Sequence, residues 1–75
     1  MATLNTILPG KAVRLRALYT PEPLKTRLMD LGFVPGTRVE VLFAAPSGSP
    51  RAYGLLHTVI ALRQQDAAQL EVEPL

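Results

Sequence analysis

Length, composition and charge already exclude several classes for this chain of 75 residues. A chain this short builds one hydrophobic core, so we expect a single domain over residues 1–75. Without cysteine it has neither disulfides nor thiolate metal sites, and its net charge of +2 indicates no strongly charged partner surface. It has no signal-peptide pattern and no apolar run of membrane-spanning length, so we expect a cytoplasmic protein.

The first predicted strand covers residues 11–18. Apolar Val13, Leu15 and Ala17 alternate with basic residues, and this period of two is typical of a half-buried strand. We expect these three side chains to face the core.

A short helix is predicted next. Thr20 can cap its free backbone amides, and Leu24, Leu28 and Leu31 recur at the spacing of one helix face. This stripe should pack against the core.

A rigid turn should follow the helix. Gly32 can take the left-handed conformation that ends a helix, with Phe33 folding back onto Leu28 in a Schellman motif. Pro35 and Gly36 then fit the two central positions of a type II turn.

The remaining chain is rich in strand patterns. A second strand is predicted over residues 37–43, with Val39, Val41 and Phe43 facing the core. Residues 53–63 are continuously β-rich, and we place their bend at His57-Thr58. After one helical turn, a last strand points Leu70 and Val72 inward.

These elements indicate a mainly β protein with about five strands and one short helix between the first two. We expect a small closed or nearly closed barrel, because closure removes the exposed edges that an open five-stranded sheet would leave.

Residues for catalysis or metal binding are scarce. His57 is the single histidine, whereas zinc and iron sites need several convergent ligands. A role for His57 in a turn or in packing is the simpler interpretation. The one candidate metal site is His57 together with a carboxylate from another molecule. Ser47 and Ser49 lie in a loop without a neighbouring base, so no serine triad is indicated. We predict no enzyme activity and no cofactor.

Nucleic-acid binding is the first alternative function. Residues 1–63 hold all eight bases against three acids, which leaves +5, and small barrels bind nucleic acid through basic grooves with exposed aromatics. With both phenylalanines expected in the core and no tryptophan, only two tyrosines remain. We therefore expect no nucleic-acid partner.

Exposed apolar residues favour a protein partner instead. Met29 lies off the helix stripe, and Leu55, Leu56 or Val59 must lie outside wherever their strand bends. Such groups on a small body mark a partner surface or a contact between copies; covering an open barrel edge is the alternative role.

The order of these segments resembles the FeoA family, small cytosolic proteins of bacterial ferrous-iron uptake. The resemblance spans nearly the whole chain and rests on the order and spacing of several segments. They are Leu8-Pro9-Gly10, residues 27–37, residues 45–50, Ile60-Ala61-Leu62-Arg63, Asp66-Ala67-Ala68 and Leu70-Glu71-Val72.

The resemblance implies an SH3-like β-barrel and an accessory role beside FeoB, the membrane transporter with a GTP-binding domain that carries Fe²⁺ inward. It carries no catalytic residues over. The module is also similar to the C-terminal domain of iron-dependent repressors, so a metal-responsive regulatory module is a second alternative. Family members often have aspartate at the position of Ser49, and charged or glycine residues at those of Gly54, Leu56 and His57.

We therefore predict a non-catalytic module that binds the cytoplasmic region of FeoB and meets the membrane only through it. The more apolar third strand also suggests weak self-association through residues 53–59. The candidate partner-binding residues are Arg27, Met29, Asp30, Tyr53, Leu55 and Leu56.

Overall fold

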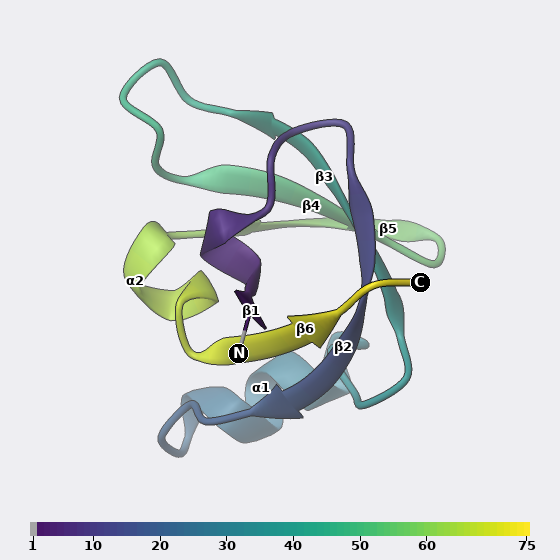
Figure 1. Cartoon of the computed structure of the whole chain (residues 1–75). Coiled ribbons are helices and arrows are strands. Elements are labelled where there is room, and N and C mark those ends of the chain that lie inside the picture. Colours follow the sequence, from purple (N-terminus) through teal and green to yellow (C-terminus); the bar gives the residue numbers. More distant parts are fainter. Residues whose placement is uncertain (1) are drawn as a thin grey trace.

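Six antiparallel strands form one curved sheet in the computed structural model, which describes residues 2–75 (Figure 1). The strand order is β1-β6-β2-β3-β4-β5, and the helix α1 connects the first two long strands, as predicted. The extra strand is a two-residue pairing at the N-terminal end. The elements are β1 (Ala2–Thr3), the 3₁₀ helix η1 (Leu4–Thr6), β2 (Ala12–Leu18), α1 (Leu24–Asp30), β3 (Arg38–Ala44), β4 (Arg51–Leu55), β5 (Thr58–Leu62), α2 (Gln64–Ala67) and β6 (Leu70–Glu73).

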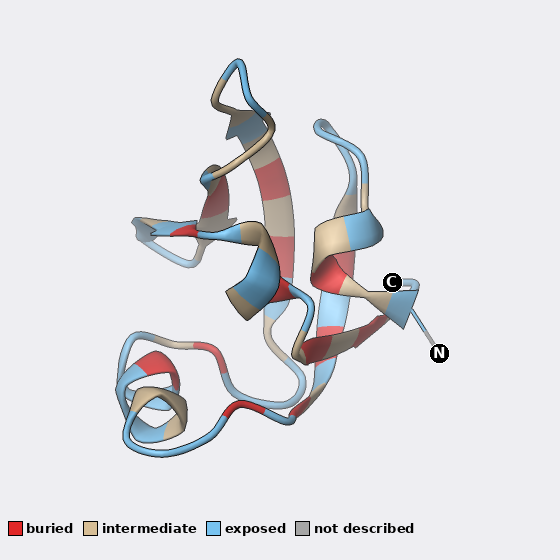
Figure 2. Ribbon diagram, turned by 90° about the vertical axis from the view of Figure 1, so that its left-hand side faces the viewer, coloured by how far each residue is buried: buried red, intermediate tan, exposed pale blue. Residues whose placement is uncertain are grey.

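The core lies inside the curve of the sheet, where buried positions recur along the strands (Figure 2). The helix α1 contributes Leu28, and the segment after it contributes Phe33. Nearly all of the core is aliphatic or aromatic, so its stability comes from apolar burial. The largest fully buried side chains are Tyr53, Phe33, Leu4, Leu15, Leu28, Leu70, Val39 and Val41.

Two irregularities in strand register reverse the predicted faces beyond them. The pairing of β3 with β4 shifts between Val41 and Phe43, and Phe43 is 63% exposed. An extra residue on one strand moves later side chains to the other face, so the prediction that Phe43 faces the core was wrong. A shift between Leu15 and Ala17 similarly leaves Ala17 half-buried and buries Leu18.

The helix α1 begins later than predicted, and Thr20 does not cap it. A residue before proline is biased away from helical conformation, which keeps Glu22 outside the helix because Pro23 follows. The Glu22 carboxylate instead accepts hydrogen bonds from the Thr26 hydroxyl at 2.7 Å and backbone amide at 2.9 Å. These bonds hold the pKa of Glu22 below its ordinary value.

The end of α1 is the predicted Schellman motif. Gly32 has a φ of 112° and donates its amide to the Met29 carbonyl at 3.1 Å, while Phe33 donates to the Leu28 carbonyl at 3.0 Å. Both Phe33 and Leu28 are buried, so one local motif ends the helix and joins it to the core.

The type II turn at residues 34–37 is also confirmed. Gly36 has a φ of 96°, and the Thr37 amide donates to the Val34 carbonyl at 3.1 Å. Leu15 on β2 receives a hydrogen bond from the Gly36 amide and donates one to the Thr37 carbonyl, both at 2.8 Å. The turn is therefore fixed against the sheet, which places the residues before and after it.

Candidate functional site

A cavity of about 680 Å³ opens between the end of α1, the turn after it, the start of β3 and the tip of the β4–β5 hairpin. Four apolar side chains, two glycines and a few polar groups form its wall, a composition typical of a docking site. We call it the hairpin pocket. Its lining residues are Leu31, Gly32, Val34, Thr37, Arg38, Glu40, Gly54, Leu55, Leu56 and His57.

Two glycines shape this wall. A Cβ on Gly32 would lie 3.4 Å from the Leu55 Cδ1 atom, and a Cβ on Gly54 would lie 3.3 Å from the Leu42 side chain. The glycine that ends the helix thus also lets the hairpin approach it closely. Gly54 in turn leaves room for Leu42 to lie over β4.

The polar groups on the rim carry little net charge. Arg38 and Glu40 form an ion pair at 3.7 Å, with both side chains largely exposed. Such a pair contributes little stability in water. Because the two charges offset each other, the pocket suits an apolar group better than an ion.

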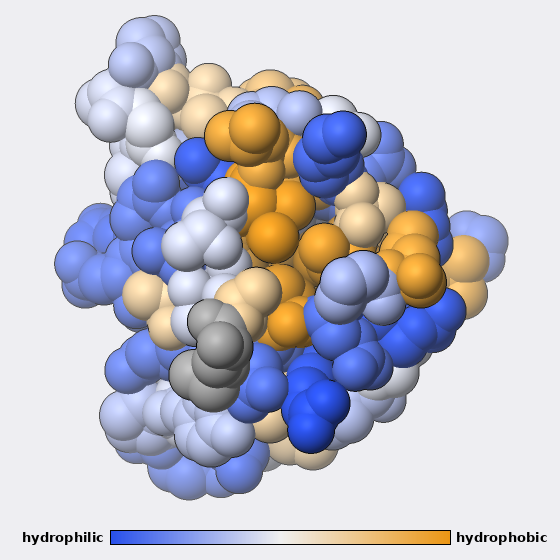
Figure 3. Space-filling model, viewed as in Figure 1, coloured by the Kyte–Doolittle hydropathy of each residue, from blue (hydrophilic) through white to orange (hydrophobic). Residues whose placement is uncertain are grey.

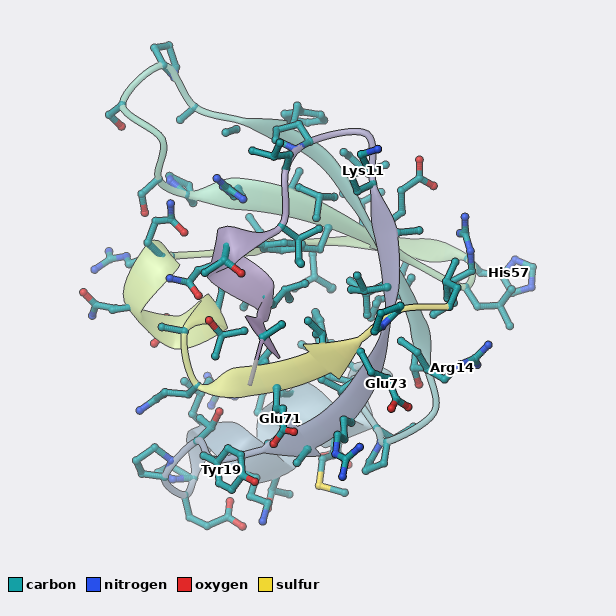
Figure 4. The ribbon with its side chains drawn as sticks, in the orientation of Figure 1. Lys11, Arg14, Tyr19, His57, Glu71 and Glu73 are labelled. Atoms are coloured by element: carbon teal, nitrogen blue, oxygen red, sulfur yellow. The ribbon has the colours of Figure 1, made fainter. Side chains whose placement is uncertain are left out.

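His57 occupies the turn of the hairpin, where the bend was predicted. Leu55 pairs with Thr58, and His57 has a φ of 68° in the left-handed region. Figure 4 shows His57 at the outer end of the hairpin, pointing away from the body of the protein. Across residues 2–75, no three His, Cys, Asp or Glu side chains gather where they could hold a metal ion. A role for His57 as a ligand stays a prediction.

A matched pair of substitutions separates a structural role of His57 from a metal-binding one. His57→Ala should unfold at lower urea than His57→Gly, by about 1 kcal/mol in unfolding free energy, because an L-residue is strained at this φ. If His57 also ligates a divalent metal, the wild type should gain unfolding free energy when the metal is added, and both variants should lose this gain equally. Urea titrations with and without added Zn²⁺ make the comparison.

The predicted partner-binding residues divide into three groups. Leu55 and Leu56 line the hairpin pocket, and Leu56 is 80% exposed whereas Leu55 packs partly against the core. Met29 is partly exposed but lies outside the lining, as do Arg27 and Asp30.

Tyr53 belongs to the third group, because its side chain is 0% exposed. A partner cannot reach it, so its prediction as a contact residue was wrong. On β4 the Tyr53 side chain lies in the core, between the buried Ala52 and the half-buried Gly54. Among residues 2–75 the Tyr53 hydroxyl makes no hydrogen bond of regular geometry, and Arg51 is the polar side chain that approaches it. Burial raises the pKa of Tyr53 above 10.0, and the nearby positive charge of Arg51 opposes this only in part.

Replacing Tyr53 with phenylalanine should raise the unfolding free energy at pH 7 by about 1 kcal/mol, because it removes a buried hydroxyl that makes no regular hydrogen bond. The tyrosine ionises more readily unfolded than folded, so its contribution to stability is lost as pH rises through and above 10.0. Tyr53→Phe should therefore lose less stability than the wild type in alkaline urea titrations. Tyr19→Phe is the control: its exposed phenol donates to Glu71 at 3.0 Å, so no gain is expected at pH 7.

Two of the four apolar lining residues were missed by sequence reasoning. Leu31 was assigned to the buried stripe, but the helix ends at Asp30 and Leu31 is 42% exposed. Val34 was only the residue before the predicted turn at Pro35 and Gly36, yet its side chain also lines the pocket. The signal that could have found Leu31 is its place next to Gly32, where the helix face ends.

A second hollow of about 350 Å³ lies between η1, β2, β6 and the C-terminal residues. Figure 3 shows apolar side chains gathered there. Its apolar lining includes Ile7, Leu8, Val13 and Leu75. No sequence pattern pointed to it, because these residues come from distant segments.

None of the helices in residues 2–75 has both the length and the apolar character that crossing a bilayer requires.

Comparison with known proteins connects this geometry to one family. The profile of the FeoA domain matches residues 2–74. A fusion of Fe(2+) transport protein A with the Fe(2+) transporter FeoB from Porphyromonas gingivalis is 37% identical over 49 residues, which are 65% of this chain and 6% of that protein.

Two solved structures from the same family are similar to this chain in fold. Iron(II) transport protein A from Clostridium thermocellum has a TM-score of 0.91 and 32% identity over 99% of this chain and 46% of its own. The zinc complex of Stenotrophomonas maltophilia FeoA, described as a prokaryotic SH3 domain protein, has a TM-score of 0.82 and 26% identity over 97% of this chain and 91% of its own. The predicted SH3-like fold is confirmed.

Proposed function

The chain belongs to the FeoA domain family, and on this premise we propose that it is a non-catalytic cytoplasmic module that docks on the cytoplasmic region of FeoB. Membership itself fits an accessory role in ferrous-iron transport. The finer proposal is that the partner is FeoB and that the hairpin pocket is the surface that contacts it directly. The chain then meets the membrane only through FeoB.

The observation that carries the proposal is the fused relative. In the Porphyromonas gingivalis protein the two components share one polypeptide, which keeps them at high effective concentration. A family member that is not fused to FeoB would reach it by binding. The chain spans only 6% of that protein, and the transport activity belongs to the whole.

The hairpin pocket has the character that such binding needs. Leu31, Val34, Leu55 and Leu56 offer apolar surface from two elements that the core holds in place. An apolar side chain of the partner entering this cavity would be removed from water, which supplies most binding free energy in small interfaces.

The hydroxyl groups of Ser47 and Ser49, in the loop between β3 and β4, support a non-catalytic role. The Ser47 hydroxyl donates to the Ser49 carbonyl at 2.9 Å, and the Ser49 hydroxyl accepts from the Gln64 amide at 3.1 Å. Both serines thus serve local structure. A nucleophile would need a neighbouring base.

The charge distribution on β2 and β6 favours the protein-docking proposal over the nucleic-acid alternative. On the outer face of β2 and β6, Arg16 pairs with Glu71 at 3.1 Å and with Glu73 at 3.4 Å. Figure 4 shows Tyr19 beside Glu71 on the same face. These carboxylates offset positive charge that phosphates would otherwise meet. A retardation assay at low salt tests this alternative.

Two finer expectations remain proposals. A metal-responsive role would require His57 to bind a divalent ion, which the matched His57 variants test. Self-association through residues 53–59 cannot use the buried Tyr53, so any contact between copies must involve other residues of this hairpin.

The direct test of the proposed function is a binding titration of the wild-type chain against the purified cytoplasmic region of FeoB, repeated without nucleotide, with GDP and with a non-hydrolysable GTP analogue. Saturable binding in at least one nucleotide state is expected. Absence of binding in all three states would contradict the proposal.

A further inference from the structure

The strand β5 leaves one edge of the sheet unpaired. It is the last strand in the sheet order and pairs only with β4. In an antiparallel pair, alternate residues point their amide and carbonyl groups away from the partner strand. Among residues 2–75, no backbone hydrogen bond outside the β4 pairing engages residues 58–62. The edge can therefore accept another strand.

This edge also lacks the features that usually prevent strand pairing. Residues 58–62 contain no charge, proline or glycine, and their register with β4 has no bulge. Val59 is 59% exposed and Ala61 is exposed. The opposite edge, β1, is only two residues long, which is a common form of protection. Within residues 2–75, β5 is thus the one long and unprotected edge.

We propose that β5 pairs with β5 of a second copy of this chain, antiparallel about a two-fold axis at Ile60. In this register Ile60 lies opposite itself, Val59 opposite Ala61, and Thr58 opposite Leu62. Every pair keeps both side chains on the same face of the joined sheet, because antiparallel partners share a face. The same patch serves both copies, as a closed two-fold contact requires.

The choice of a second copy rests on this self-complementarity. No position in the paired segment meets a like charge, and the first charged side chain is Arg63, just beyond it. The register places Arg63 of the second copy opposite His57, at the rim of the hairpin pocket. In the dimer, Arg63 of each copy would then add a positive group beside His57 in the other copy's pocket. Among the residues that the structure describes, a single chain has no such group on the His57 side of its pocket.

The apolar surface around β5 extends the contact. Ala61 pairs with Ala52, which pairs with Phe43 on β3. Phe43 is exposed because of the register shift described above. Along this row of paired residues the side chains are apolar up to the free edge, with Ala52 buried between the exposed Phe43 and Ala61.

Sedimentation equilibrium of the full chain, from micromolar to millimolar concentration, tests the proposal. The wild type should form dimers, and Ala61→Lys should raise the dimer dissociation constant at least about tenfold, since an edge lysine blocks strand pairing. Leu8→Lys is the control, because it adds the same charge at an exposed loop residue outside β5. Circular dichroism confirms that each variant folds. A wild type that stays monomeric at millimolar concentration, or an Ala61→Lys variant whose dimer dissociation constant equals that of the wild type, would overturn the proposal.

Single cysteines test the register, because the chain has no other cysteine. Ile60→Cys should form a disulfide-linked dimer on mild oxidation, since its two copies face each other across the axis. Thr58→Cys should not, because its copies lie several residues apart. Cross-linking of Thr58→Cys in preference to Ile60→Cys would refute the two-fold at Ile60. Neither experiment involves FeoB, so the dimer and the proposed docking can fail independently.

Discussion

Changing Leu56 to aspartate should weaken binding to the cytoplasmic region of FeoB at least about tenfold, because the partner would cover a charge where it now meets an apolar group. Leu56 lines the hairpin pocket and is 80% exposed. Its side chain contributes little to the core, so the unfolding free energy should change by no more than about 0.5 kcal/mol. Calorimetric titration measures the affinity, and urea unfolding checks the fold.

The matched control for this prediction is Leu8→Asp. Leu8 is 65% exposed and lies outside the hairpin pocket, so this change should leave the affinity unaltered. Equal losses for the two variants would show that the pocket is not the docking surface. Leu55→Asp is a poorer test, because Leu55 packs against the core and its change would also destabilise the fold.

Replacing Phe33 with alanine should lower the unfolding free energy by about 3–5 kcal/mol, which is most of the stability of a domain this small. The Phe33 side chain is fully buried, and its amide closes the Schellman motif at the end of α1. Loss of the ring leaves a cavity next to the helix stop. Urea unfolding followed by circular dichroism gives the value.

The neighbouring Val34→Ala variant is the control for this second prediction. Val34 is 37% exposed, so the change should cost much less than the loss of Phe33. Because Phe33 anchors the segment that forms one wall of the pocket, its variant should also bind FeoB more weakly at temperatures where it is partly unfolded. A cost below about 1 kcal/mol for Phe33→Ala would contradict the assigned packing.

Local features of the fold were predictable from the sequence. Gly32, Pro35 and Gly36 have conformational properties that few other residues share, so the helix stop and the turn follow from neighbouring residues alone. The strands β2 and β3 followed from alternation of polar and apolar side chains, and β4 and β5 from a continuously β-rich stretch. These signals act over a few residues and need no tertiary contact.

Features that depend on strand register were not predictable. The shift near Phe43 has no glycine or proline to mark it, and it arises from the pairing of β3 with β4. The burial of Tyr53 likewise depends on which face of β4 meets the core. Glu22, and not Thr20, accepts hydrogen bonds from the first turn of α1 because the helix starts later than predicted. Helix propensity alone leaves the first residue of a helix uncertain by a few positions.

The sequence predicted two of the four apolar residues that line the hairpin pocket. Leu55 and Leu56 stood out because a short strand held more apolar residues than its inner face could bury. Leu31 and Val34 did not, because each had a sufficient structural role in the helix or the turn. The segment that builds the fold therefore also forms one wall of the candidate site, and only its tertiary position reveals this second role.

The most direct test of docking through the hairpin pocket is a nuclear magnetic resonance titration of the isotope-labelled chain with the unlabelled cytoplasmic region of FeoB. The largest amide shift changes should fall on the residues that line the pocket, which are Leu31, Gly32, Val34, Thr37, Arg38, Glu40 and residues 54–57. Changes centred instead on the charged face of β2 and β6, around Arg16 and Glu71, would contradict the account.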